Sequence, residues 1–159
     1  MYTILLLTEE TLTEHDVARV AALHGDEPLE VHVLVPADTK HSALVEALDE
    51  VALGRLRDAL EDSKDASPEQ AQQDAMHAVN TSVDILRAAG LTARGSVTGD
   101  DPVPAAVEAV SRFDVDEILV VTPPHLVRET LHRDWASRLR DKVKLPLLHF
   151  VAGTDRVVG

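Results

Sequence analysis

The amino-acid sequence predicts a single α/β domain: a doubly wound parallel sheet of five strands, in the order 3-2-1-4-5, with helices on both faces. Segments with strand character alternate with segments of helical periodicity, which is typical of parallel sheets with right-handed crossovers. The first and fourth strand segments are unbroken apolar runs, as expected of strands covered on both faces. They should therefore lie in the middle of the sheet. A chain of 159 residues fits one such domain, and we assign residues 1–159 to it.

The five predicted strands are short apolar or β-branched segments bounded by turn residues. In chain order they are Thr3–Thr8, Leu29–Val35, Leu91–Thr98, Glu117–Val121 and Pro146–Val151. The second stops at Pro36, because proline lacks the N–H group that a ladder needs. The third is the weakest, and Gly95 within it indicates a sheet edge or a bulge.

Capping residues and apolar spacing predict the helices of the first half of the chain. Thr13 is a predicted N-cap, with Asp16 in the capping-box position, and this helix ends before Gly25. Helical spacing over residues 42–63 predicts an extra helical segment, and Ser67 caps the helix that follows it. The predicted buried face of that helix contains Met76, Val79, Val83 and Leu86.

Two further helical regions follow. Asp101 and Pro102 begin one, in which Val103 and Val107 lie on the predicted apolar face. One or two short helices are expected within residues 126–142.

The composition excludes several kinds of partner and site. The chain has 28 acidic and 15 basic residues, a formal net charge of -13 and only 3% aromatic residues. Such a charge repels nucleic-acid backbones, and few rings are available to stack on bases, so we expect no nucleic-acid partner. The absence of cysteine excludes disulfides and thiolate metal sites. No apolar run approaches the roughly 20 residues of a membrane span, so we expect no membrane contact and a cytoplasmic location.

The strand order places any small-molecule site at the carboxyl ends of the first and fourth strands, where the order reverses. We expect this cleft to be lined by residues at strand ends and in the segment after the fourth strand: Thr8, Glu9, Glu10, Val35, Thr122, Pro123, His125, Arg128 and Trp135. Glu9 and Glu10 are consecutive, so on an extended chain their carboxylates point in opposite directions. They are therefore not expected to form an acid–base pair.

Segments in the second half of the chain resemble a known family. Gly99-Asp-Asp-Pro102 precedes a helical segment, which is followed by Asp114-Val-Asp-Glu-Ile-Leu-Val-Val121, and the last strand reads Leu145-Pro-Leu-Leu-His-Phe-Val151. These segments are similar to the "G-D-P, helix, D-L-I-V-V-G" passage and the closing "C-P-V-L-V-V" strand of the universal stress protein family. The resemblance implies an adenine nucleotide alpha hydrolase-like fold and a stress-response or regulatory function.

The resemblance does not extend to the family's nucleotide site. Nucleotide-binding members have an acidic residue after the first strand, where Glu9 stands here, and the glycine pattern G-x2-G-x9-G-[S/T] after the fourth. Thr122, His125, Trp135 and Ala136 occupy those four positions. Because backbone N–H groups cradle a phosphate only where no side chain intervenes, we expect ATP binding to be lost and no cofactor to be present.

Two alternatives remain open for this cleft. In the first, side chains replace the glycine loop and hold ATP, another adenine nucleotide or a small anion. The donors would be His125, Arg128, His132 and Arg133. In the second, the chain is an enzyme of the nucleotide hydrolase class with His125 as a general base. No nucleophile is placed beside that residue and no Gly-x-Ser-x-Gly elbow occurs, so we expect a protein that is not an enzyme.

Other histidines and the tryptophan have simpler interpretations. The histidine and acidic residues of segment 125–134 have a metal-ligand spacing, but their charged neighbours favour a solvated helix, so no metal is expected. His32 and His149 lie in apolar runs and are predicted to be buried with one ring nitrogen bonded. Trp135 is predicted to be a packing or interface anchor.

The last strand is a predicted sheet edge, because residues 152–159 are too few to form a covering helix. Edge strands pair with other chains unless they are blocked, and members of the family are similar in forming dimers through this strand. We therefore expect an antiparallel homodimer through the last strand, to which Arg156–Val158 could add contacts. The pairing residues are Leu147, Leu148, His149, Phe150 and Val151.

Overall fold

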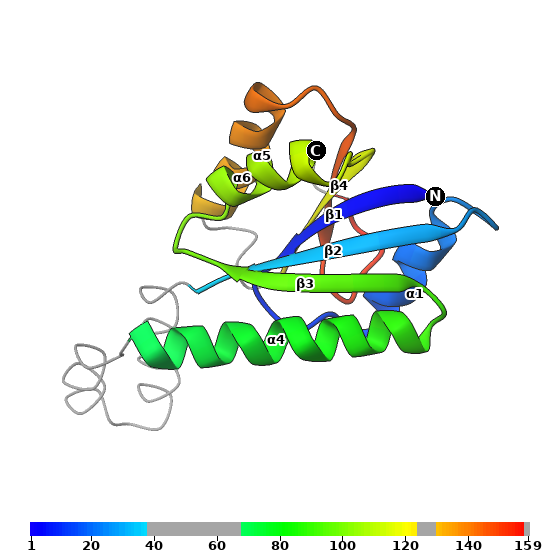
Figure 1. The fold of residues 1–159 in the computed structure, drawn as a ribbon, viewed down its shortest axis with the longest axis horizontal. Coiled ribbons are helices and arrows are strands. Elements are labelled where there is room, and N and C mark those ends of the chain that lie inside the picture. The colour runs from blue at the N-terminus through cyan, green and yellow to red at the C-terminus, as the bar shows by residue number, and fades with distance from the viewer. Residues whose placement is uncertain (38–67, 124–129, 158–159) are drawn as a thin grey trace.

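The computed structural model describes residues 1–37, 68–123 and 130–157, with the side chains of all of these except 68 and 130–134. Its sheet has five strands in the order β3-β2-β1-β4-β5, and every neighbouring pair is parallel (Figure 1). The predicted fold class and strand order are therefore confirmed. The extra helical segment predicted over 42–63 lies outside the described residues.

The strands differ in burial according to their place in the sheet. Their bounds are β1 Tyr2–Thr8, β2 Leu29–Pro36, β3 Thr92–Thr98, β4 Glu117–Thr122 and β5 Leu147–Val151. β1 pairs with both β2 and β4, and every residue of β4 is buried. The two unbroken apolar runs thus occupy the middle of the sheet, as predicted, because only there are both strand faces covered.

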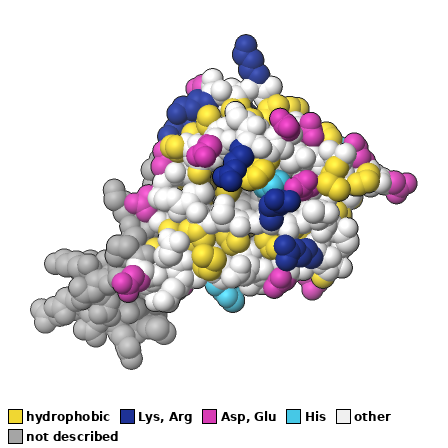
Figure 2. Space-filling view, viewed as in Figure 1, with side chains coloured by type: hydrophobic (Ala, Val, Ile, Leu, Met, Phe, Trp, Pro, Cys, Tyr) yellow, Lys and Arg dark blue, Asp and Glu magenta, His cyan; other side chains and the backbone are white. Residues whose placement is uncertain are grey.

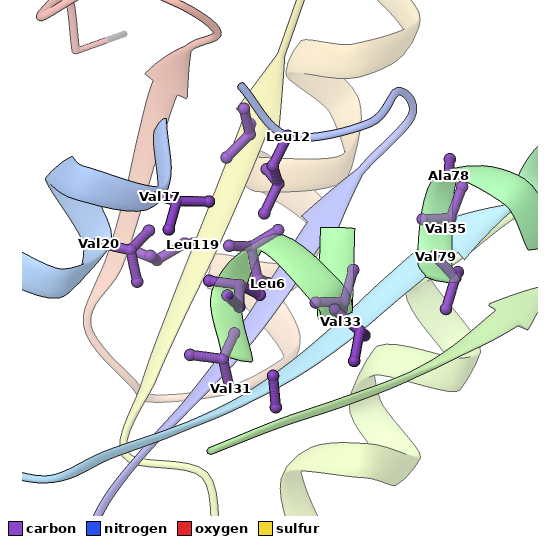
Figure 3. Packing of buried hydrophobic residues seen from close by; sticks show 14 of the residues in the cluster. Leu6, Leu12, Val17, Val20, Val31, Val33, Val35, Ala78, Val79 and Leu119 are labelled. Atoms are coloured by element: carbon purple, nitrogen blue, oxygen red, sulfur yellow. The ribbon is translucent and has the colours of Figure 1, made fainter. Parts of the chain in front are cut away.

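The helices form a layer on each face of the sheet (Figure 1). α1 (Glu14–Ala22) and α4 (Pro68–Ala88) cover one face, and α5 (Val103–Arg112) and α6 (Thr130–Lys142) cover the other. Each layer encloses its own apolar cluster. In the first of these, Val17 and Val20 of α1 and Val79 of α4 pack towards Leu6 and Val33 of the sheet (Figure 3).

The start of α1 confirms the predicted capping box. The Thr13 hydroxyl oxygen accepts a hydrogen bond from the Asp16 N–H group at 3.1 Å, and the Asp16 carboxylate accepts one from the Thr13 N–H group at 3.1 Å. Two backbone donors that the helix leaves unpaired are satisfied in this way.

The buried face of α4 differs from the prediction at one position. Met76 is 45% exposed, whereas Ala75, Ala78 and Val79 are buried. The row of residues that faces the sheet therefore passes through Ala75 and not through its neighbour Met76. No helix in the described part of the chain is long and apolar enough to cross a membrane.

Gly95 is the point of closest approach between α4 and the sheet. A Cβ atom at this position would lie 2.8 Å from Val79 Cγ1 and 3.0 Å from the carbonyl oxygen of Val33. β3 is an edge strand, as Gly95 indicated, and its register with β2 runs without a bulge from Thr92 to Thr98. The glycine therefore marks a close helix–strand contact at the edge.

Candidate functional site

The predicted cleft lies where β1 and β4 end side by side. Thr8 is level with Val121 in the parallel register, so the loops that follow the two strands begin next to each other. Both strands are central, and the strand order reverses between them. This is the position at which ligands enter open α/β sheets.

The candidate residues do not all face the same side of this position. Val35 packs in the α1/α4 cluster, and Thr8 shares its side of the sheet because side chains alternate along β1 from Ile4 and Leu6. Thr122 and Trp135 lie on the α5/α6 side, where Trp135 belongs to the buried cluster. The sheet therefore separates these four candidate residues into two pairs, one on each face.

The loop after β1 is held by its own hydrogen bonds and by α4. The Thr8 hydroxyl donates to the carbonyl oxygen of Glu10 at 2.8 Å. The Leu12 N–H group donates to the hydroxyl oxygen of Ser82 at 3.0 Å, within the buried interior. Both carboxylate oxygens of Glu9 are buried, whereas Glu10 is exposed. The two glutamates thus have different environments.

Ser82 was not recognised from the sequence as a residue of this region. It is fully buried on α4, 70 positions away from Leu12. A serine inside a helical pattern usually faces solvent or its own backbone, so its position gave no signal of a contact with this loop.

At the end of β4, a hydroxyl and an imidazole form a buried pair. Thr122 Oγ1 and His149 Nε2 are 2.5 Å apart, and the two residues are 1% and 3% exposed. A hydroxyl beside an imidazole nitrogen can act as a nucleophile with its base. Burial prevents a substrate from reaching this pair, so the contact joins β4 to β5. The predicted burial of His149 with a bonded nitrogen is confirmed.

His32 is likewise buried and bonded, as predicted. Its Nε2 atom lies 2.9 Å from Glu30 Oε1, and its ring stacks on Phe113 with the centroids 4.1 Å apart. Burial lowers the pKa of His32 below its ordinary value, and the nearby Glu30 only partly offsets this effect. The imidazole is therefore held in its neutral form.

Trp135 and its neighbour are core residues. Trp135 is 7% exposed and Ala136 is 2% exposed, and both pack in the cluster that contains Leu5, Leu7 and Val120. The predicted role of Trp135 in packing is confirmed. The indole thus fills space between α6 and the sheet.

Part of the predicted site lies outside the described residues. His125 and Arg128 are not described, nor are the side chains of His132 and Arg133. Among the side chains that the structure does describe, no group of three or more histidine, aspartate or glutamate residues is arranged to hold a metal ion. Pro123 is described, and it is buried directly after β4.

An ion pair fastens the segment that carried the family resemblance. Arg138 of α6 donates two hydrogen bonds to the Asp101 carboxylate, at 3.2 and 2.6 Å. Asp101 also accepts the Val103 N–H group at 3.1 Å, at the start of α5. The hydrogen bond from Arg138 is the main cause of the lowered pKa of Asp101. The sequence predicted that Asp101 lies at the start of this helix but not its contact with Arg138, which lies 37 positions away.

Two hollows lie away from this cleft, one on each side of edge strand β3. A hollow of about 480 Å³ is bounded by Val79, Val83 and Arg87 of α4 and by Gly95. A smaller one, of about 170 Å³, is bounded by α5 and by Ser96–Thr98 of β3. Figure 2 shows this side of the molecule, with Lys and Arg side chains spread among apolar and acidic ones. Neither charge sign dominates here.

Comparison with solved structures identifies the fold. Hypothetical protein MJ0577 is 16% identical with a TM-score of 0.53, over 97% of this chain and 98% of that chain. Hypothetical protein PH0823 is 18% identical with a TM-score of 0.50, over 97% of each chain. The chain has the fold of these proteins. It is the doubly wound, five-stranded α/β fold that the sequence predicted.

A universal stress protein from Archaeoglobus fulgidus is also similar, with 16% identity and a TM-score of 0.49, over 96% of this chain and 94% of that chain. No family model matches the sequence, and no curated protein matches it. Proteins of one fold differ in ligands and partners, so the likeness concerns the architecture.

Proposed function

We propose that this chain is a universal stress protein-like regulatory module that acts as a homodimer and does not bind ATP. The fold shared with the solved structures supports the architecture of such a module. The segments from Gly99 to Pro102 and from Asp114 to Val121, which resemble the family, support the family role.

The burial of Trp135 and Ala136 is the observation that carries the proposed loss of ATP binding. Phosphates bind at helix starts, where backbone N–H groups are unpaired and uncovered, whereas Trp135 and Ala136 lie inside α6, which begins at Thr130. At the positions of the third glycine and the hydroxyl residue, this chain instead has an indole and a methyl group packed in the core. To admit a phosphate there, α6 would have to withdraw Trp135 from its contacts with the sheet.

The buried contact between Thr122 and His149 supports a module without catalytic activity. The hydroxyl and the imidazole are closed off from solvent, and the Thr122 carbonyl oxygen accepts the Ala152 N–H group at 2.9 Å. Both polar groups of Thr122 thus contribute to the link between β4 and the end of β5.

Calorimetric titration of the full chain with ATP and Mg²⁺ tests the proposal. We expect no saturable heat at ligand concentrations up to about 1 mM, which corresponds to a binding free energy weaker than about -4 kcal/mol. Binding with a micromolar dissociation constant would refute the loss of ATP binding. If Arg128→Ala then removed that binding and Arg140→Ala, a change of an exposed arginine on α6, did not, side chains would be replacing the glycine loop.

The proposed homodimer uses β5, which is an edge of the sheet. Leu147 and Leu148 are only half-buried at this edge, so a partner strand would cover apolar surface there. Sedimentation velocity tests this part of the proposal: a chain that stays monomeric in all the forms described in the next section would refute it.

A further inference from the structure

The backbone groups of β5 face β4 and the outer edge of the sheet in turn. Ile118 donates to the Pro146 carbonyl oxygen, and Ala152 donates to the Thr122 carbonyl oxygen, each at 2.9 Å. Because the direction of backbone groups alternates along a strand, Leu147, His149 and Val151 direct theirs away from β4. These three residues are the ones a second copy could pair with.

The end of the chain already occupies part of this edge. After β5 the backbone turns at Gly153, which has a φ of +71°, and returns antiparallel to the strand so that Val157 bridges Phe150. The Val151 N–H group donates to the carbonyl oxygen of Arg156 at 3.1 Å. We call residues 152–157 the C-terminal cap. It lies next to β5 at the edge of the sheet, in the position that a partner strand would occupy.

Arg19 of α1 holds the C-terminal cap in place. Its guanidinium donates to three successive carbonyl oxygens, those of Thr154 at 2.8 Å, Asp155 at 3.0 Å and Arg156 at 3.2 Å. The same group lies over the ring of Phe150, 3.7 Å from its centroid. One side chain therefore binds both the cap and the strand that the cap covers, with charge-assisted bonds.

Two neighbours on α1 add to this clamp. The Asp16 carboxylate, which is 3% exposed, accepts the Gly153 N–H group at 2.8 Å. His15 Nε2 lies 2.8 Å from Asp155 Oδ1 at the surface. The buried Asp16 carboxylate thus binds both the N-cap residue of α1, Thr13, and the turn of the C-terminal cap at Gly153.

We propose that the C-terminal cap competes with a second copy of the chain for the β5 edge, and that Arg19 sets the outcome of this competition. The inference rests on the proposed homodimer through β5. An antiparallel pair of β5 strands centred on His149 places Leu148 of the second copy opposite Phe150, where Val157 of the cap lies. The two cannot occupy this position together, because each edge accepts one neighbouring strand at a spacing of about 4.8 Å.

While the cap is in place, it occupies Val151 and the position opposite Phe150, so only the start of β5 is left for a partner strand. Such a ladder is short, and isolated two-stranded pairings are marginal in water. When the cap is released, the Val151 N–H group becomes available to a partner strand, and Val157 no longer blocks the position opposite Phe150. The chain is therefore mainly monomeric while the clamp is closed and pairs along the whole strand when it opens.

Sedimentation velocity over a concentration series tests this competition with three proteins. They are the full chain, Arg19→Ala, and Arg140→Ala as a matched loss of one exposed arginine. We expect the dimer dissociation constant of Arg19→Ala to be lower than that of the other two by about tenfold or more, which corresponds to about 1.4 kcal/mol. A variant truncated after Ala152 lacks the cap but keeps Arg19. We expect its dimer dissociation constant to be lowered to the same extent, so it serves as the test if Arg19→Ala does not fold.

Amide hydrogen exchange identifies the surface that pairs. In the dimer, the N–H groups of Leu147 and His149 should exchange more slowly than in the monomer, because the partner strand covers this edge of β5.

Equal dissociation constants for all forms would overturn the inference. If all forms were dimeric with these two amides protected, the homodimer would stand and the competition would be wrong. If all forms were monomeric at the highest concentration, both the homodimer and the competition would be wrong.

Discussion

Substitution of Gly95 by alanine tests the contact that sets the position of α4 on the sheet. The added Cβ atom would lie 2.8 Å from Val79 Cγ1, 3.0 Å from the Val33 carbonyl oxygen and 3.2 Å from Val83 Cγ2. The valine methyl groups can shift by side-chain rotation. The Val33 carbonyl belongs to the neighbouring strand β2, so it moves only if the ladder between β2 and β3 is distorted.

The expected cost is the difference of two terms. An extra methyl group in a packed site destabilises a protein by about 1–3 kcal/mol, while alanine is favoured over glycine within a strand by about 0.5–1 kcal/mol. Gly95→Ala should therefore lower the free energy of unfolding by roughly 0.5–2 kcal/mol. Urea denaturation followed by circular dichroism measures this as a lower midpoint with an unchanged slope.

Gly99→Ala is the matched control, because a Cβ atom there would meet nothing within 4 Å. Its free energy of unfolding should stay within about 0.5 kcal/mol of the original. A double variant, Gly95→Ala with Val79→Ala, removes the closest methyl contact and should be more stable than the sum of the single effects by about 0.5 kcal/mol or more. Equal stability of the Gly95 and Gly99 variants, or full additivity in the double variant, would refute the close contact.

Two further predictions concern pH. The lowered pKa of buried His32 means that the unfolded chain takes up a proton first as the pH falls below about 6.5, so stability is lost towards acid. His32→Gln should reduce the loss between about pH 7 and pH 5 in urea denaturation, whereas exposed His77→Gln should not; equal losses in the two variants would contradict this. For Asp101, whose pKa is lowered, the bond to Arg138 stabilises the fold above the ordinary value of 3.8 and is lost as the pH falls through the folded-state pKa. Asp101→Asn should cost about 0.5–1 kcal/mol near pH 7, with a difference from the original chain that narrows as the pH falls below 3.8; a constant difference would show that the charge is not involved.

The sequence alone determined the architecture. Unbroken apolar runs predicted that β1 and β4 lie in the middle of the sheet, and the spacing from Thr13 to Asp16 predicted the first helix and its cap. A helix cap depends on residues within one turn of each other, and the burial of a strand depends on how apolar its own residues are. Both can therefore be predicted from short segments of the sequence. Gly95 indicated an edge for the same reason, because a strand with small and polar residues has one side uncovered.

The sequence predicted one cleft for its candidate residues, but it did not show on which face of the sheet each of them lies. It could not separate Thr8 and Val35 from Thr122 and Trp135, which the sheet places on opposite faces. Side chains alternate between the two faces of a sheet along each strand. The register between neighbouring strands decides which residues share a face. That register is set by the packing of the helices, not by the composition of either strand end.

Only the tertiary structure decided how the edge of β5 is used. The prediction that β5 is an edge is confirmed, and pairing with a second copy stays a prediction. The contacts of Arg19 and Asp16 with the C-terminal cap join residues more than 130 positions apart in the sequence, and no spacing pattern relates them. They arise because the parallel sheet brings the start of α1 beside the end of β5, where a guanidinium and a buried carboxylate meet backbone groups that no strand has paired.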